Sequence, residues 1–181
     1  MTVTYEKLSK TIAFALRHDP HAFELTMDAA GWVAITELAE ALSRAFQVRV
    51  TDEQIMQVVA TDSKKRYTTS QGLIRASQGH SIPIDLGLIA TLPPTVLYHG
   101  TVQPAIESVF AIGLIPKSRE YVHLSAYVET ARSVGARRGS PIIIEVAALA
   151  AFEAGVEFFL SENDVWLARK VPAAFLTLVR S

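Results

Sequence analysis

The residues best suited to chemistry in this chain are cations and histidines, and they gather in four short stretches. These are "LRHDP" at 16–20, the region 63–81 with "SKKRY" and "IRASQGHS", "LYHGT" at 97–101, and "PKSREYVHLS" at 116–125. All five histidines lie in or beside these stretches. Arginine offers a planar fork of donors and lysine a compact charge, so such a set suits a phosphate ligand.

Three cations, Lys64, Lys65 and Arg66, are adjacent in a chain whose formal net charge is only −1. If this run enters a strand, Lys64 and Arg66 point to one face and Lys65 to the other. The pair, joined by Arg17 from another element, could hold a phosphate. The alternative is a solvated strand entry, with Arg17 serving only the dipole of its helix.

Two further groups point to a ligand in the second half of the chain. The tripeptide His99-Gly100-Thr101 ends a predicted strand, where glycine allows a ligand to approach the backbone closely. His123 alternates with Tyr121 and Ser125, so the three should share one strand face. A turn glycine and a core histidine are the alternatives for these positions.

The first half contains the pattern of three helices followed by a hairpin. Leu8, Ile12 and Leu16 predict a helix that ends near Asp19-Pro20. "GWVAITELAEAL" predicts an extended piece and a helix with Thr36 as its N-cap, and Thr51 with Gln54 predicts a capping box. "KRYTT", a turn at 70–72 and "LIRAS" predict a β-hairpin. This order favours a winged helix.

The second half is rich in strands, with helices between them. Strands are predicted at "TVLYHGT", "YVHLSA", "SPIIIEVAAL", "GVEFFLS", "DVWLAR" and "FLTLV", and helices at "QPAIESVFAIG" and "YVETARSVGARRG". Pro93-Pro94 cannot continue a helix or a central strand, so we expect a boundary between about 81 and 94. The prediction is an α+β protein with lobes at 1–85 and 93–181.

Composition excludes several classes of protein. The 181 residues include no cysteine, so disulfides, thiolate metal sites and a cysteine nucleophile are excluded. The phosphate loop, the dinucleotide-binding glycine fingerprint and the H-E-x-x-H motif are absent, and we expect no metal. Neither a leader nor an apolar run of membrane-spanning length is visible. We therefore expect a soluble cytoplasmic protein with no membrane partner. Separately, we expect a monomer, although these features do not bear on the oligomeric state.

Taken in order, the motifs "LRH", "KKRY", "IRASQGHS", "LYHGT", "SREYVHLS" and "NDVWL" resemble those of the RNA 2′-phosphotransferase family, also called tRNA 2′-phosphotransferases. The resemblance spans Leu8 to about Leu178. It implies an N-terminal winged-helix lobe that binds RNA and a C-terminal ADP-ribosyltransferase-like lobe that binds NAD+, with the active site in the cleft between them. NAD+ is then a consumed co-substrate, and the partner is a 2′-phosphorylated, tRNA-like RNA from tRNA splicing.

The resemblance also implies roles for individual residues. The family's catalytic tetrad maps to Arg17, Lys64, Arg66 and Arg119, and the His-His-hydrophobic signature of the NAD+ lobe maps to His99, His123 and Val165. Gly100, Thr101 and Ser125 join the NAD+ site, and the expected RNA-binding residues are His18, Arg75, Gln78, His80 and Ser81. Arg132, Arg137 and Arg138 could face the diphosphate or the RNA, or could end a solvated helix. Where the family reads "NGVWL", this chain has "NDVWL", with Asp164 at the glycine position.

The expected reaction has two steps. The RNA 2′-phosphate first displaces nicotinamide from NAD+ to give a 2′-phospho-ADP-ribosylated RNA. The ribose hydroxyl then attacks the phosphodiester, which releases 2′-OH RNA and ADP-ribose 1″,2″-cyclic phosphate. The alternatives are an ADP-ribosyltransferase that modifies nucleic-acid ends or protein, and a winged-helix binding protein without activity.

Overall fold

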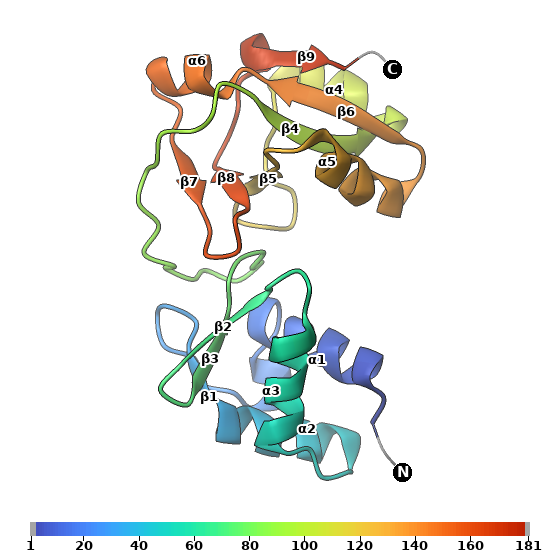
Figure 1. Ribbon diagram of the computed structural model, residues 1–181, viewed down its shortest axis with the longest axis vertical. Helices are drawn as coiled ribbons and strands as arrows, with labels where there is room; N and C mark the ends of the chain where they lie inside the picture. The colour runs from blue at the N-terminus through green and yellow to red at the C-terminus, as the bar shows by residue number, and fades with distance from the viewer. Residues whose placement is uncertain (1–2, 180–181) are drawn as a thin grey trace. The chain divides into compact units, whose positions relative to one another are not determined.

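The computed structural model describes residues 3–179, and the chain divides into two compact units, one up to Gly87 and one from Leu88 onward (Figure 1). The division falls within the seam expected at 81–94. Both units mix helices with small sheets, which is consistent with the predicted α+β class.

The first unit contains three helices and one small antiparallel sheet (Figure 1). The sheet has the order β1-β3-β2, with Val33 opposite Ile74 and Tyr67 opposite Ala76. The elements are α1 (Tyr5–Arg17), a 3-10 turn η1 (His21–Phe23), β1 (Val33–Ala34), α2 (Ile35–Phe46), α3 (Asp52–Thr61), β2 (Tyr67–Ser70) and β3 (Leu73–Ala76).

Local sequence explains most of these boundaries. Leu8, Ile12 and Leu16 are buried on one side of α1, as their spacing predicts. The Thr51 side chain accepts from the Gln54 amide and the Gln54 side chain from the Thr51 amide, so the capping box is confirmed. The predicted hairpin is also confirmed, and its turn residues Gln71 and Gly72 both have positive φ, as a two-residue hairpin turn requires.

The predicted N-cap of α2 is wrong. The helix begins at Ile35, its N-cap is Ala34, and Thr36 lies inside its first turn. The reason is not local, because β1 pairs with β3 and the Ile35 amide donates to the carbonyl of Gly72 at 2.9 Å. Pairing with the hairpin therefore sets where this helix starts.

The second unit contains two three-stranded antiparallel sheets, in the orders β4-β6-β9 and β5-β8-β7. Its α-helices and strands are labelled in Figure 1. Its elements are β4 (Leu97–Val102), η2 (Gln103–Ala105), α4 (Ile106–Ile112), β5 (Val122–Leu124), α5 (Val128–Gly135), η3 (Ala136–Arg138), β6 (Pro141–Val146), α6 (Ala148–Glu153), β7 (Phe158–Leu160), β8 (Trp166–Ala168), η4 (Ala173–Phe175) and β9 (Leu176–Leu178). Gly113 ends α4 as predicted, whereas the last two residues of the predicted strand "SPIIIEVAAL" belong to α6.

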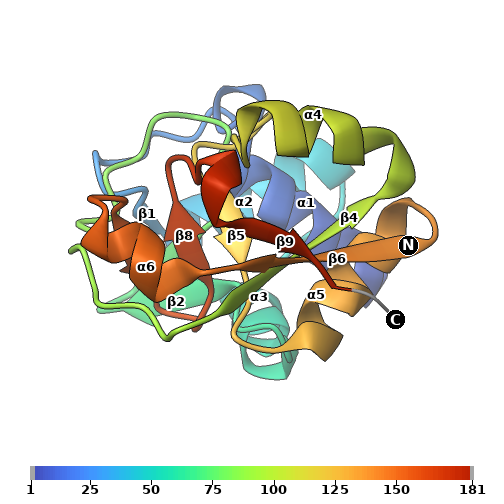
Figure 2. The ribbon, with the colours of Figure 1, turned by 90° about the horizontal axis from the view of Figure 1, so that it is seen from above.

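Helices α4 and α5 cover opposite faces of the β4-β6-β9 sheet (Figures 1 and 2). The approach of α5 is unusually close, because a Cβ added to Gly100 would lie 1.8 Å from the carbonyl oxygen of Ala131. Gly100 is thus required by helix packing, which is a different reason from the ligand approach predicted for it. The two sheets are joined where Tyr98 and Ser125 exchange backbone hydrogen bonds of 2.8 and 2.9 Å.

The described part of the chain contains neither a membrane-crossing helix nor a cluster of metal-binding side chains. Between residues 3 and 179, no helix combines the length and the apolar character needed to cross a membrane. Within the same residues, no group of three or more histidines, aspartates or glutamates is arranged to hold a metal ion.

Candidate functional site

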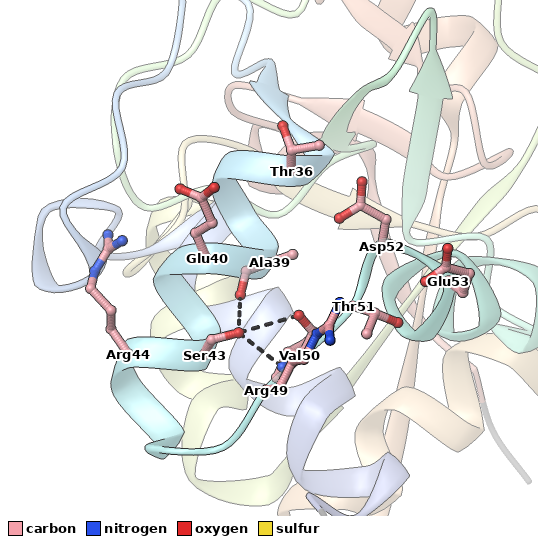
Figure 3. Close-up of a pocket in the computed structure, with 10 residues that line it drawn as sticks. All are labelled: Thr36, Ala39, Glu40, Ser43, Arg44, Arg49, Val50, Thr51, Asp52 and Glu53. Carbon is pink, nitrogen blue, oxygen red and sulfur yellow. Dashed lines mark hydrogen bonds between the residues drawn. The ribbon is translucent and has the colours of Figure 1, made fainter.

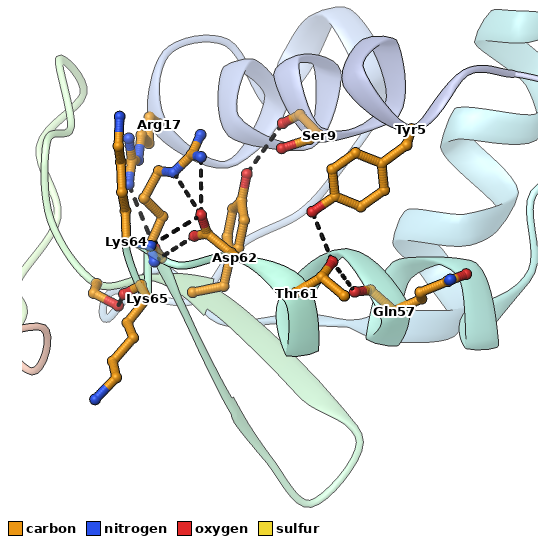
Figure 4. Close-up of polar contacts among 11 residues, drawn as sticks. Tyr5, Ser9, Arg17, Gln57, Thr61, Asp62, Lys64 and Lys65 are labelled. Atoms are coloured by element: carbon orange, nitrogen blue, oxygen red, sulfur yellow. Dashed lines mark hydrogen bonds and ion pairs between the residues drawn. The ribbon is translucent and has the colours of Figure 1, made fainter.

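The cation run lies in a turn, so the prediction that it enters a strand is wrong. Strand β2 begins only at Tyr67, and Lys65 adopts a left-handed backbone conformation with φ of 45°. Lys64 and Lys65 nevertheless extend in opposite directions, with Lys65 pointing away from the side chain of Arg17 (Figure 4). The separation of the cations therefore arises from turn geometry and not from strand alternation.

A buried carboxylate organises this turn. The side chain of Asp62 is only 2% exposed, and it accepts from the backbone amide of Arg66 at 2.7 Å. It also receives the Arg66 guanidinium, with Nε at 3.1 Å and Nη2 at 2.8 Å from Oδ1. The sequence analysis did not single out Asp62. An acidic residue four positions before an arginine at a helix end was the available signal.

Arg17 lies beside the same turn. Its Nη2 donates to the backbone carbonyl of Arg66 at 3.4 Å. Its guanidinium carbon lies 3.7 Å from the position that a Cβ on Gly79 would occupy. The first unit therefore brings together Arg17 and Arg66, two of the predicted tetrad residues, and Lys64 belongs to the same turn (Figure 4).

The residues predicted to bind RNA include an exposed pair beside Arg17. The Nδ1 of His18 lies 2.9 Å from the hydroxyl of Ser81, and both residues are exposed. The Ser81 amide donates to the carbonyl of Arg17 at 2.9 Å, which fixes this pair next to the arginine. Gln78 is half-buried in the same loop.

His80 and Arg75, by contrast, are buried. His80 is 3% exposed, and its pKa falls to about 4 because burial disfavours the imidazolium and Arg17, His18 and Arg75 add positive charge nearby. Arg75 is 9% exposed, with its guanidinium 4.6 Å from the centre of the Trp32 ring. The contribution of these two residues to RNA binding stays a prediction. The burial of His80 and the contact of Arg75 with Trp32 stabilise the first unit.

In the second unit, the two histidines of the predicted NAD+ site meet where β4 approaches β5. The Nδ1 of His99 lies 3.0 Å from the carbonyl oxygen of His123. A carbonyl can only accept, so Nδ1 carries the proton and Nε2 of neutral His99 is an acceptor. Burial lowers the pKa of His99, the bond to His123 opposes this, and Arg138 and Lys117 lower the pKa further.

Arg119 is bound to the second of these histidines. Its Nη1 lies 3.2 Å from Nδ1 of His123, and since arginine can only donate, that nitrogen accepts. Desolvation lowers the pKa of Arg119, as do the positive charges of Arg138 and Arg137. The four cations around the histidines, Lys117, Arg119, Arg137 and Arg138, form no carboxylate ion pair within residues 3–179. The structure therefore gathers positive charge beside His99 and His123.

Val165 lies at the end of the hairpin between β7 and β8. Ser161 fixes the turn, because its hydroxyl accepts from the Val165 amide at 3.0 Å and its own amide donates to the Val165 carbonyl at 3.0 Å. Asp164, at the family's glycine position, has φ of 59°. Aspartate tolerates this left-handed conformation better than most residues, so the turn keeps the geometry that glycine would allow.

A separate cavity of about 640 Å³ opens on the first unit between α2 and the start of α3 (Figure 3). Both cations, Arg44 and Arg49, and acids, Glu40, Asp52 and Glu53, line this cavity. Inside the cavity, the Ser43 hydroxyl donates to the Ala39 carbonyl at 2.7 Å and accepts from the Val50 amide at 2.8 Å. This hydroxyl therefore joins α2 to the segment before α3 and is not left for a ligand. None of the predicted site residues lines this cavity.

Comparison with known proteins identifies the family. A model of the "RNA 2′-phosphotransferase, Tpt1 / KptA family" matches residues 4–170. Relatives named "Probable RNA 2′-phosphotransferase" include one from Acetivibrio thermocellus, 44% identical over 96% of this chain and 97% of the relative. Those from Acaryochloris marina and Rhizobium johnstonii are 43% and 44% identical, over 95% and 94% of this chain and 96% and 92% of the relatives. With arginines and histidines gathered in each unit and a match over nearly its whole length, this chain belongs to the RNA 2′-phosphotransferase, Tpt1/KptA family.

Proposed function

We propose that this protein is an enzyme that removes an internal 2′-phosphate from RNA and consumes NAD+ in doing so. The observation that carries the proposal is the family match over residues 4–170. The clustering of Arg17 with Arg66 supports it, because those guanidinium groups come from α1 and from the turn after α3, which are far apart in sequence.

The first unit is proposed to be a winged-helix lobe that holds the phosphorylated RNA. Arg66 uses Nε and Nη2 for Asp62. Its Nη1 makes no hydrogen bond within residues 3–179, so one edge of the guanidinium is available to a phosphate oxygen. Arg17 lies beside it and Lys64 adds a third charge. His18 and Ser81 sit on the exposed side of Arg17, where they suit contact with the neighbouring nucleotide.

The second unit is proposed to bind NAD+, and its residues fit that ligand. The acceptor Nε2 of His99 suits a ribose hydroxyl. Positive charge from Arg137, Arg138 and Lys117 suits the diphosphate. Val165 follows the turn that ends β7, and the β5–β8 register carried one step further places it opposite Ser125.

NAD+ supplies a ribose carbon, C1″, with nicotinamide as its leaving group, and later a neighbouring 2″-hydroxyl that attacks the phosphorus and expels the RNA 2′-oxygen. Arg17, Lys64 and Arg66 hold the attacking 2′-phosphate, so positioning supplies much of the rate. Arg119 and Lys64 are proposed to stabilise the negative charge that develops on the phosphoryl oxygens in the second step. His123 holds Arg119 in place through their 3.2 Å contact.

The proposal is tested with a short RNA that carries one internal 2′-phosphate. We expect NAD+-dependent formation of 2′-OH RNA, with nicotinamide and ADP-ribose 1″,2″-cyclic phosphate in equal amounts. Arg66→Ala and Lys64→Ala should abolish most of this turnover. Release of nicotinamide without the cyclic phosphate would instead identify an ADP-ribosyltransferase, and no nicotinamide release would refute the enzymatic proposal.

Arg119→Ala separates the two steps. The variant should slow the second step by about 10²–10³-fold, the usual cost of losing a group that stabilises a developing anion. 2′-Phospho-ADP-ribosylated RNA should then accumulate, which denaturing gel electrophoresis detects as a slower band. A variant that forms the cyclic phosphate at the wild-type rate would contradict the role given to Arg119.

A further inference from the structure

We infer that Asp62 is a positioning residue that fixes the direction of the Arg66 guanidinium and, through Arg66, that of Arg17. This inference rests on the proposed function, because it concerns the residues proposed to hold the 2′-phosphate. Asp62 is the residue that follows α3, and it is buried although it is an acid. Buried carboxylates are retained where specific partners compensate their charge.

The Asp62 carboxylate binds both the backbone and the side chain of Arg66. Its Oδ2 accepts from the Arg66 amide at 2.7 Å, and its Oδ1 receives Nε and Nη2 of the same residue at 3.1 and 2.8 Å. An arginine whose backbone amide and guanidinium are both bound to one carboxylate loses most of its rotamer freedom. The Arg66 side chain is only 31% exposed, and Asp62 occupies its Nε and Nη2.

The same carboxylate and its backbone carbonyl shape the turn that carries the lysines. The Lys64 amide lies 3.4 Å from Oδ1, and the Lys65 amide donates to the Asp62 carbonyl at 2.9 Å. These contacts hold Lys65 in its left-handed conformation, which costs an ordinary residue about 1–2 kcal/mol. Asp62 therefore also determines that Lys64 and Lys65 leave the turn in opposite directions (Figure 4).

The effect extends to Arg17 through the backbone of Arg66. The Arg66 carbonyl accepts from the Ser77 amide at 2.9 Å and from Nη2 of Arg17 at 3.4 Å. Next along the chain, the Tyr67 hydroxyl donates to the Ser9 carbonyl at 3.1 Å and ties this segment to α1 (Figure 4). Rotation of the turn would consequently displace Arg17 as well as Arg66.

Asparagine is the discriminating substitution, because it has the shape of aspartate but only one acceptor oxygen. Asp62→Asn can serve either the Arg66 amide or its guanidinium, and it presents N–H groups to the other. We expect kcat on the 2′-phosphorylated RNA to fall about 10²-fold, the scale of a misplacement of about 1 Å. The KM for NAD+ should change less than threefold. The control is Glu24→Gln, which removes the carboxylate of an exposed ion pair with Arg44.

A double-mutant cycle distinguishes positioning from general damage to the fold. If Asp62 acts mainly through the Arg66 side chain, Asp62→Asn should lower the rate of Arg66→Ala by clearly less than the about 10²-fold by which it lowers that of the wild type. The loss that remains reflects the contacts of Asp62 with the backbone, which also position Lys64 and Arg17. Equal losses in both backgrounds would overturn the inference. Wild-type kcat in the Asp62→Asn enzyme would overturn it too.

A measurement that needs neither turnover nor a folded Asp62 variant completes the test. In ¹H–¹⁵N spectra of the wild type, the Arg66 Nε–H resonance, assigned by its loss in Arg66→Lys, should exchange slowly with water because Asp62 holds it. Fast exchange would overturn the positioning role. If the wild-type protein removes no 2′-phosphate, the proposed function fails, and the exchange rate of this resonance alone decides the role of Asp62.

Discussion

Replacing Gly100 by alanine is expected to destabilise the second unit strongly, although it adds one methyl group. A Cβ at this position would lie 1.8 Å from the Ala131 carbonyl oxygen and 2.9 Å from the Gly135 amide nitrogen. Both atoms belong to the backbone of α5, so no side chain can rotate away. The helix would have to withdraw from β4 by about 1.6 Å to reach the 3.4 Å at which ordinary contact begins.

Overpacking usually costs 1–3 kcal/mol, and a clash with backbone belongs at the upper end, so we expect a loss of about 3 kcal/mol. For a unit of this size the loss corresponds to a fall in Tm of roughly 10–20 °C. Gly135→Ala should cost less, because its Cβ would lie 3.1 Å from the Thr101 carbonyl oxygen. The order of the two variants is thus part of the prediction.

The assay uses the two tryptophans of the chain, one in each unit. In a Trp32→Phe background, the fluorescence of Trp166, which is 9% exposed, reports unfolding of the second unit alone. Ser133→Ala, exposed on α5, is the control. A Gly100→Ala protein that melts within about 2 °C of its parent would refute the packing argument, and would restore ligand approach as the reason for this glycine.

Three further changes test other parts of the structure. The free energy of unfolding should fall by up to about 3 kcal/mol between pH 6.5 and 4, because unfolded His80 binds a proton in this range while the folded imidazole, with a pKa of about 4, does not. Lys65→Ala should change kcat on 2′-phosphorylated RNA less than threefold, whereas Arg66→Ala should lower it by about 10²-fold or more. Asp164→Gly should raise stability by about 1 kcal/mol by relieving a left-handed residue, and Asp164→Val should lower it.

Each of these has a direct measurement. Urea unfolding at several pH values measures the pH dependence of the free energy of unfolding. If His80→Gln shows the same pH dependence as the wild type, the assignment to His80 is contradicted. Single-turnover kinetics gives the second, and equal losses at positions 65 and 66 would contradict the inequality of the two cations. Urea unfolding also gives the third, where a loss of stability in Asp164→Gly would show that the aspartate side chain, and not the backbone, determines this turn.

The sequence predicted correctly the features that depend on residues close together in the chain. The capping box of Thr51 and Gln54 joins residues three apart, and the hairpin turn depends on Gln71 and Gly72. The start of α2 escaped prediction, because Ala34 pairs with Leu73 in β3 and sequence alone does not show that partner. Likewise, the predicted strand "SPIIIEVAAL" ends early, at Val146 of β6, and its last two residues begin α6, where Ala148 is buried.

The site shows the same division. The motifs singled out the cations and histidines, but strand periodicity misjudged the turn at Lys64 because the carboxylate of Asp62 accepts from its amides. The burial of Arg75 and His80 was also not predictable, since it depends on Trp32 and Arg17 from other elements. The sequence shows which residue types occur and at what spacing, whereas tertiary contacts decide which of those side chains reach solvent.

The pair of backbone hydrogen bonds between Tyr98 and Ser125 allows local opening of the predicted NAD+ site to be measured by amide hydrogen exchange. These bonds join the two sheets next to His99 on one strand and two residues after His123 on the other. A single opening event must break both, so the amides of Tyr98 and Ser125 should give the same opening free energy once each exchange rate is corrected for its intrinsic rate. That free energy would report how readily the two strands separate beside the histidines, without any ligand being present.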